Sequence, residues 1–266
     1  MTSTAKIARL DFERYAITHR MHGYIPASRR YVMDTYIKPG MKVLDLGCGD
    51  GQHLEYLAKS LPKRDLFGTE ISQIRVDRVN KKGFTCAKVD GFRLPYADRA
   101  FDAIIFFEVI EHIPELEVEP LLHEIARVLK PNGVVVGSTP NYPIKRYYDF
   151  SHRILSLFGR IPAFGVNGKK PHQAASETYP NESTAPLPKE ATRRQPWLIH
   201  KVGRLFADDP THQYFCSFNR IYRLGKKHFQ DVELFTTFKA IAKPVVISNP
   251  VKLFSHKIVF VFKNCN

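Results

Sequence analysis

The chain has 266 residues, enough for one large domain with insertions or for two small ones, and its 44% hydrophobic and 25% charged residues argue against wholesale disorder. The formal net charge is +14, yet residues 41–140 hold 13 Lys and Arg against 15 Asp and Glu, so the positive excess lies in the flanks. Basic flanks attract anionic partners such as phosphates, acidic glycans or anionic lipids, although they can equally be a solvated surface.

Residues 1–39 are expected to form an N-terminal helical cap, and a regular alternation of strand and helix patterns follows over residues 40–141. Short apolar runs predict five strands, at residues 42–47, 65–71, 84–90, 101–109 and 133–141. Helical spacing of apolar residues predicts helices at residues 53–61, 72–83 and 120–133, with Ser72 as an N-cap and Pro120 in a first turn. Such units imply right-handed crossovers and a parallel, doubly wound sheet.

The alternation breaks after the fifth strand, because residues 140–210 hold nine of the 18 prolines and show no core periodicity. Residues 142–210 are predicted to be a basic insertion or lid, since long irregular segments inside a domain are usually functional or disordered. A helix at 215–229 and strands at 232–241 and 257–263 follow, so residues 211–266 are predicted to form the C-terminal half of the same domain. The predicted fold is α/β, with a doubly wound, mostly parallel sheet of seven strands.

No segment of the chain has the length of a membrane span, because the longest apolar runs, AIIFF and IVFVF, are far too short. The N-terminus has no apolar core of secretory length, and the four cysteines form no CxxC pair. We therefore expect a cytoplasmic protein without a transmembrane segment and without a cysteine metal cage, while peripheral membrane contact is left open.

Ligands of doubly wound sheets bind beyond the carboxyl ends of the strands, so the residues that end each strand are the candidates for a site. The first strand ends in VLDLGCGDGQ, where Gly47, Gly49 and Gly51 allow a tight turn and a close approach of a ligand to the backbone. In a dinucleotide fingerprint the third glycine comes one residue later, and Asp45 and Asp50 make this loop a poor host for a pyrophosphate. The acidic loop suits a ligand with a cationic ammonium and sulfonium.

The following strand ends carry side chains suited to an adenosine. Glu70 ends the second strand, where a carboxylate can accept both hydroxyls of a ribose. Asp90, Gly91 and Phe92 follow the third strand, where a carboxylate can accept from the exocyclic amine of adenine and an apolar side chain can cover the ring. Glu108 ends the fourth strand. Together these ends predict a site for an adenosine with a charged, phosphate-free tail.

Four segments match the successive motifs of one family: VLDLGCGDGQ, GTEIS, AKVDGFRLPYADRAFDAIIFFEVIEHI and EIARVLKPNGVVVGSTPN. In these residues the chain resembles the class I S-adenosylmethionine-dependent methyltransferases, in the branch of methyltransferase type 11 and the ubiquinone-biosynthesis-like O-methyltransferases. The resemblance covers residues 40–141 and, more faintly, 211–264. It implies S-adenosyl-L-methionine as the cofactor, with Asp45, Gly47, Gly49 and Gly51 around its methionine part, Glu70 at the ribose, Asp90, Gly91 and Phe92 at the adenine, and Glu108 near the methionyl group.

The segment EVIEH at the end of the fourth strand is the candidate catalytic site, because in a helical turn Glu108, Glu111 and His112 would share one face beside the methyl donor. Transfer to an oxygen needs a base, and His112 leads because an unperturbed imidazole titrates near neutrality, with Glu111 orienting its ring. In a second interpretation these residues bind a divalent metal together with His212, a pattern that resembles the small-RNA 3′-end 2′-O-methyltransferases. In a third they are structural.

The leading expectation is an O-methyltransferase for a small molecule, a lipid-linked intermediate or a glycan, with the basic insertion as a substrate lid. One alternative is an RNA 2′-O-methyltransferase, whose basic flanks and aromatic residues would contact phosphates and bases, although the sequence contains no recognisable RNA-binding module. The other is a non-catalytic cofactor-binding module, which the suitable chemistry at every cofactor position disfavours. The acceptor itself is not predicted, because fold and cofactor do not name a substrate.

Overall fold

A computed structural model describes residues 12–14, 16–17, 24–89, 93–141, 216–238, 241–244 and 257–264 of the chain. All of these residues belong to one compact unit, which consists of Met1–Arg146 and Asp209–Asn266. The lid predicted over residues 142–210 lies outside the described residues, as do the predicted site residues Asp90, Gly91, Phe92 and His212.

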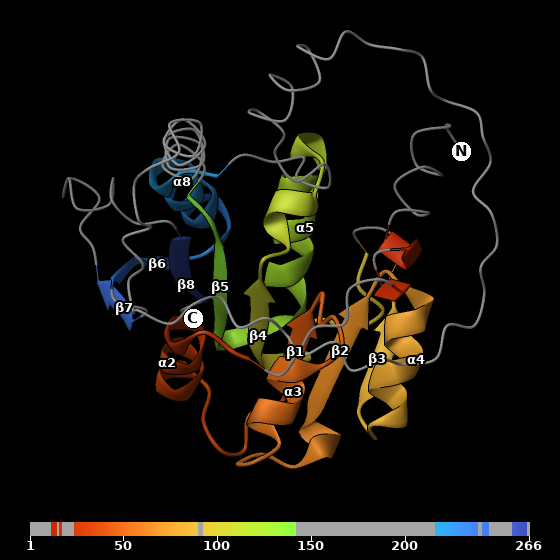
Figure 1. The fold of residues 1–266 in the computed structure, drawn as a ribbon. Coiled ribbons are helices and arrows are strands. Elements are labelled where there is room, and N and C mark those ends of the chain that lie inside the picture. The colour runs from red at the N-terminus through yellow and green to blue at the C-terminus, as the bar shows by residue number, and fades with distance from the viewer. Residues whose placement is uncertain are drawn as a thin grey trace, which may run out of the picture. The chain divides into compact units, whose positions relative to one another are not determined.

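The described strands form one mixed sheet in the order β3-β2-β1-β4-β5-β8-β6-β7 (Figure 1). Its parallel part comprises β1 (Val43–Leu46), β2 (Leu66–Glu70), β3 (Thr85–Lys88), β4 (Phe101–Phe107) and β5 (Leu129–Pro140). Antiparallel pairs join β5, β8 (Lys257–Lys263), β6 (Asp231–Phe238) and β7 (Ile241–Pro244). The predicted mostly parallel sheet is confirmed. The strand expected at 232–241 corresponds to β6, and the short β7, which was not predicted, extends the described sheet to eight strands.

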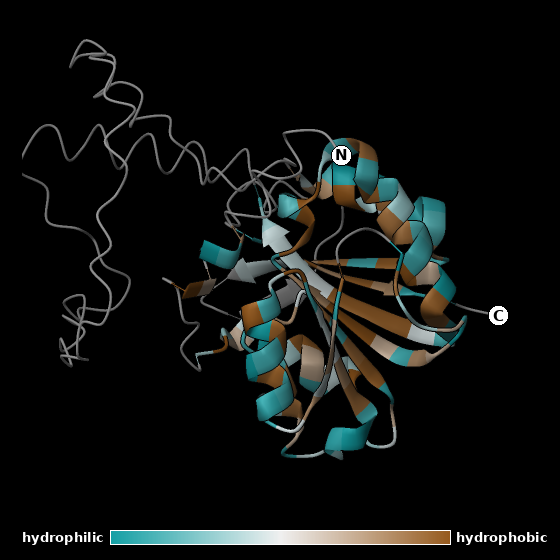
Figure 2. Cartoon of the chain, turned by 90° about the vertical axis from the view of Figure 1, so that its right-hand side faces the viewer, coloured by the Kyte–Doolittle hydropathy of each residue, from teal (hydrophilic) through white to brown (hydrophobic). Residues whose placement is uncertain are grey.

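Helices cover both faces of this sheet, as a doubly wound fold requires. On one face lie α2 (Ala27–Tyr36), α3 (Gln52–Leu57) and α4 (Gln73–Lys81). On the other face lie α5 (Glu115–Val128) and α8 (Phe218–His228). The central strands are largely hydrophobic and the helices turn polar residues outward (Figure 2), which is the pattern of a sheet buried on both sides.

The helix before β5 begins earlier than its sequence suggests. The predicted start at Pro120 is wrong, because α5 begins at Glu115, after an extended Pro114, and encloses Pro120. Val118 in this added turn is only 1% exposed and packs into the core. Burial of that side chain favours the earlier start and offsets part of the cost of the backbone hydrogen bond that Pro120 cannot donate.

Strand order reverses between β1 and β4, since the chain runs from β1 to β2 and β3 on one side and from β4 to β5 on the other. The carboxyl ends of these parallel strands therefore meet at one edge of the sheet, which is where ligands of doubly wound folds bind. None of the described helices is long and apolar enough to cross a membrane.

Candidate functional site

A tight glycine loop follows β1 at the point where strand order reverses. Gly47, Gly49 and Gly51 all have left-handed backbone angles, with φ of 71°, 57° and 83°. A Cβ on Gly47 would lie 2.6 Å from Cγ2 of Val109, so the loop packs directly against the turn that follows β4. Backbone geometry therefore requires glycine here, and the turn after β4 is held beside the loop.

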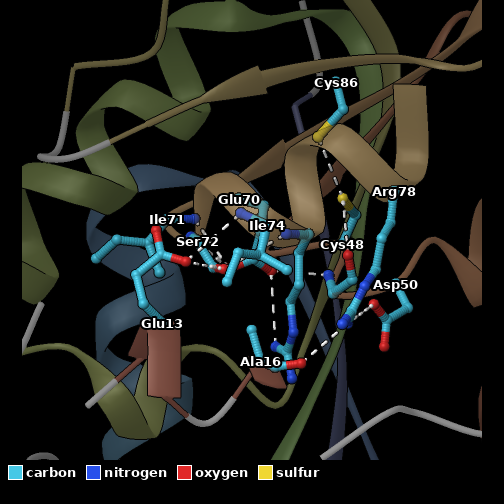
Figure 3. Close-up of polar contacts among 12 residues, drawn as sticks. Glu13, Ala16, Cys48, Asp50, Glu70, Ile71, Ser72, Ile74, Arg78 and Cys86 are labelled. Atoms are coloured by element: carbon cyan, nitrogen blue, oxygen red, sulfur yellow. Dashed lines mark hydrogen bonds and ion pairs between the residues drawn. The ribbon is translucent and has the colours of Figure 1, made fainter. Parts of the chain in front are cut away.

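Glu70, at the end of β2, braces this loop (Figure 3). Its carboxylate accepts hydrogen bonds from the backbone N–H groups of Gly49 at 2.8 Å, Ile71 at 2.9 Å and Ser72 at 3.2 Å. Burial raises the pKa of Glu70, and the nearby Arg75 and these N–H groups offset that rise only in part. A carboxylate has about four lone-pair sites, and the described residues donate to three of them, which leaves one acceptor position for a ligand hydroxyl.

Asp45, in β1, contacts a histidine that no sequence motif singled out. Nδ1 of His53 lies 3.2 Å from Oδ2 of Asp45, and both residues are buried. The His53 ring packs edge-on against Phe107, with 5.0 Å between the ring centroids. Asp50, the second carboxylate of the loop, instead accepts from Nη1 of Arg78 at 3.1 Å.

Glu108 follows β4 with a left-handed backbone angle, φ 54°, which is uncommon outside glycine. Its carboxylate accepts from Oγ of Ser138 at 2.8 Å and from Nζ of Lys257 at 2.6 Å, and it lies 3.3 Å from Nη2 of Arg29. Burial alone would raise the pKa of Glu108, but the charges of Lys257 and Arg29 outweigh burial and lower it. Glu108 is thus ionised, and its carboxylate contacts side chains from α2, β5 and β8.

Glu111 lies in the single 3₁₀ turn η2 (Ile110–His112) and points inward. It is 1% exposed, and its carboxyl group accepts from Oγ1 of Thr139 at 3.1 Å. Burial and the neighbouring charge of Glu108 raise the pKa of Glu111 to about 8. This residue is therefore protonated and uncharged near pH 7, and its carboxyl group engages β5.

His112, the predicted base, is half-buried, and its ring lies edge-on to Phe12 with 6.1 Å between centroids. The helical turn expected to place Glu108, Glu111 and His112 on one face does not form, because only η2 follows β4 and Glu108 precedes it with a positive φ. Within the described parts of the chain, no three His, Cys, Asp or Glu side chains are arranged to hold a metal ion. His212, the expected fourth ligand, lies outside those parts.

A helical segment at residues 12–14 and 16–17 contacts two sides of this edge. Its Glu13 accepts hydrogen bonds from Oγ of Ser72 and from the backbone N–H of Gln73, each at 2.7 Å (Figure 3). Its Phe12 contacts the ring of His112. The segment therefore touches both the β2–α4 turn beside Glu70 and the turn after β4.

The described site fits the cofactor that the family motifs imply. The glycine loop brings bare backbone to the carboxyl end of β1, Glu70 keeps one acceptor position for a ribose hydroxyl, and Asp45 supplies negative charge for an ammonium. The expected adenine contacts, Asp90, Gly91 and Phe92, fall outside the described residues, so their role stays a prediction.

Comparison with known proteins agrees with this geometry. Residues 44–137 match the family described as "Methyltransferase domain". The sterol 24-C-methyltransferase ERG6B of Gibberella zeae is 37% identical over 106 residues, which cover 37% of this chain and 27% of that relative. The ubiquinone/menaquinone biosynthesis C-methyltransferase UbiE of Desulfotalea psychrophila is 31% identical over 147 residues, covering 51% of this chain and 58% of that relative. The chain thus spans less than two thirds of either relative.

Solved structures of methyltransferases show the same fold. A possible histamine N-methyltransferase of Thermotoga maritima matches with a TM-score of 0.53 and 16% identity, covering 96% of this chain and 95% of its own. A methyltransferase of Archaeoglobus fulgidus matches with a TM-score of 0.52 and 18% identity, covering 88% and 90%. The architecture is the Rossmann-like methyltransferase fold. Residues 44–137 match a methyltransferase domain, and their motifs resemble those of the class I S-adenosylmethionine-dependent methyltransferases.

Proposed function

We propose that the protein transfers a methyl group from S-adenosylmethionine to a small or lipid-linked acceptor. The observation that carries this proposal is the glycine loop after β1, where strand order reverses. Its three glycines have left-handed φ angles, and the buried carboxylate of Glu70 accepts a hydrogen bond from its backbone. Glycine at three positive-φ positions leaves bare backbone where the methionyl end of the cofactor would lie. The bound cofactor supplies the methyl group as an electrophilic sulfonium.

The residues around the sulfonium end would orient the reactants and exclude water. Val109 packs on Gly47 and thereby holds η2, with His112, beside the glycine loop. In the proposed reaction Nε2 or Nδ1 of His112 accepts the proton that the acceptor loses, because imidazole is the side chain whose unperturbed pKa lies near neutrality. Glu111, whose carboxyl group accepts from Thr139, is proposed to add no second negative charge beside Glu108 while it is protonated.

The acceptor atom is proposed to be oxygen, as on a hydroxyl of a small molecule, a lipid-linked intermediate or a glycan. A carbon acceptor is the second candidate, because two relatives carry the names of sterol and ubiquinone/menaquinone C-methyltransferases. An anionic acceptor would be attracted by the cations Arg29 and Lys257, which flank Glu108. Turnover of phenolic, sterol and prenylated-quinol acceptors with a ¹³C-labelled methyl donor would separate the two atoms, because O-methyl and C-methyl carbons resonate in different regions.

Calorimetry with S-adenosylhomocysteine tests the cofactor assignment. We expect wild type to bind and Gly47→Ala to lose at least about tenfold in affinity, since its Cβ would meet Val109 and its φ of 71° is strained for alanine. Gly40→Ala is the matched control, because Gly40 has a φ of 87° but a Cβ at this position would meet no atom within 4 Å. An equal loss of affinity in both variants would show that strain at a positive φ angle, rather than the contact with Val109, weakens binding. Absence of binding by wild type would overturn the proposed function.

A further inference from the structure

Two buried nitrogen atoms near Phe107 have no hydrogen-bond partner among the described residues. They are Nε2 of His53 and Nε of Arg29, and both residues are more than nine-tenths buried, at 7% and 9% exposure. Buried polar side-chain atoms nearly always have a partner, so each orphan atom needs an explanation. Sequence motifs assigned neither residue a role.

The two nitrogens have opposite hydrogen-bonding character. Asp45 lies 3.2 Å from Nδ1 of His53, and because a carboxylate only accepts, that nitrogen carries the proton. In the tautomer with its proton on Nδ1, Nε2 is an acceptor. Arg29 Nε–H is always a donor, and Nη2 of the same guanidinium lies 3.3 Å from Glu108. The pair thus offers one acceptor and one donor.

Both nitrogens lie at the β1–β4 side of the reversal point. The His53 ring centroid is 5.0 Å from that of Phe107, and Cζ of Arg29 is 5.4 Å from the same centroid. Phe107 ends β4, and His53 belongs to the helix that the glycine loop starts. If the ribose lies at Glu70 on β2, the tail of the ligand extends toward this side.

We propose that His53 and Arg29 bind the two charged groups of the amino-acid end of the cofactor. An α-amino acid carries an ammonium, which needs an acceptor, and a carboxylate, which needs a donor. Nε2 of His53 accepts from the ammonium, with Asp45 adding attraction, and Nε–H of Arg29 donates to the carboxylate. This inference rests on the proposed function, because it concerns the same cofactor, and it predicts two determinants of cofactor affinity on α2 and α3.

Binding of two ligands distinguishes a direct contact of His53 and Arg29 with the amino-acid group from a purely structural role of these residues. S-adenosylhomocysteine has the amino-acid group, whereas 5′-methylthioadenosine has the adenosine and the thioether but no amino-acid group. His53→Asn keeps an amide N–H for Asp45 and removes Nε2, and Arg29→Lys keeps a cation for Glu108 and removes Nε–H. Each variant should weaken S-adenosylhomocysteine binding about tenfold, as expected for a lost hydrogen bond to a charged group, and change methylthioadenosine binding less than about twofold.

The control is His228→Asn, because His228 also has a buried Nε2 without a partner among the described residues but lies at the end of α8, on the other face of the sheet. It should leave both affinities unchanged. Equal weakening of both ligands by His53→Asn or Arg29→Lys would overturn the inference and leave the proposed function standing. Failure of wild type to bind either ligand would instead overturn the proposed function.

Discussion

Glu111 is a buried carboxyl beside a second, ionised carboxyl, and the two have opposite electrostatic surroundings. Arg29 and Lys257 lie next to Glu108 and lower its pKa. Glu111 is 1% exposed, and burial together with the charge of Glu108 raises its pKa to about 8. Removing both carboxyls from water as anions would be costly, so the pair holds one proton near neutral pH.

Glu111→Gln should stabilise the protein increasingly as the pH rises. The folded-state pKa of Glu111 is raised, so the stability that the protonated carboxyl provides is present below about pH 4.5 and is lost as the pH rises to about 8. Glutamine keeps the shape and stays neutral. Because one pKa unit corresponds to about 1.4 kcal/mol, the variant should gain about 2 kcal/mol or more over wild type between pH 5 and pH 8 in urea unfolding.

Glu55→Gln serves as the control, because Glu55 is a half-exposed carboxyl 3.1 Å from Lys82. Its stability difference from wild type should vary little over the same pH range. Parallel pH profiles for wild type and Glu111→Gln would show that Glu111 is ionised in the folded protein at neutral pH.

At the scale of single residues, the sequence predicts those site residues whose position depends only on neighbouring residues in the chain. Gly47, Gly49 and Gly51 were predicted because a strand that stops at spaced glycines has few other conformations, and their positive φ angles confirm the turn. The partners of Glu108 were missed, since Lys257 is 149 residues away in the chain. Arg29 was missed for the same reason, because no local pattern indicates that a helix residue will meet the end of β4.

At the scale of secondary structure, the helical segment at residues 12–17 binds the start of α4 through one carboxylate. Glu13 accepts from Ser72 and Gln73 and lies 3.8 Å from Lys88. Burial raises the pKa of Glu13, but these hydrogen bonds and Lys88 outweigh burial, so the net shift is downward. A negative charge at a helix N-terminus also interacts favourably with the helix dipole.

Glu13→Gln should loosen this segment. It removes a charge-assisted contact worth about 1 kcal/mol, so amide exchange over residues 12–17 should become about five times faster, as measured by mass spectrometry at pH 7. Glu117→Gln, in the first turn of α5, is the control for loss of a carboxylate near a helix start. The contact has no such role if exchange over residues 12–17 is the same in wild type and in Glu13→Gln. In wild type the same loosening should appear on acidification, because a lowered pKa gives stability that is lost as the pH falls through it.

Most elements were predictable because their patterns are strong over many residues. The five parallel strands and the helices between them follow from apolar runs and helical spacing, and Ser72 caps α4 through its hydroxyl, which accepts from the backbone N–H of Arg75 at 3.4 Å. The start of α5 was not predictable from Pro120, because the added turn buries Val118 in a tertiary contact that the local pattern does not show. The short β7, which follows the expected strand, was missed because it is defined by its antiparallel pairing with β6 rather than by a local pattern.

At the scale of the whole molecule, the site joins segments that are distant in the chain. The glycine loop, Glu70, the turn after β4 and α2 all meet at one edge, and β8 supplies Lys257 from near the C-terminus. A ligand that contacts several of these parts only in the folded state must stabilise the whole unit by mass action. Its thermal unfolding is therefore a test of the assembled site.

S-adenosylhomocysteine at about a hundred times its dissociation constant should stabilise the protein by about 2.7 kcal/mol. For a domain of this size that free energy corresponds to a rise in Tm of about 5–10 °C, measurable by differential scanning fluorimetry. NAD and ATP at the same concentration should shift Tm by less than about 1 °C, because the loop carries Asp45 and Asp50 and repels a pyrophosphate. A comparable rise with NAD or ATP would contradict the acidic-loop argument, since the loop would then accept phosphates. If only S-adenosylhomocysteine raises Tm, the result supports the statement that the negative charge of the glycine loop selects a cofactor without phosphate groups.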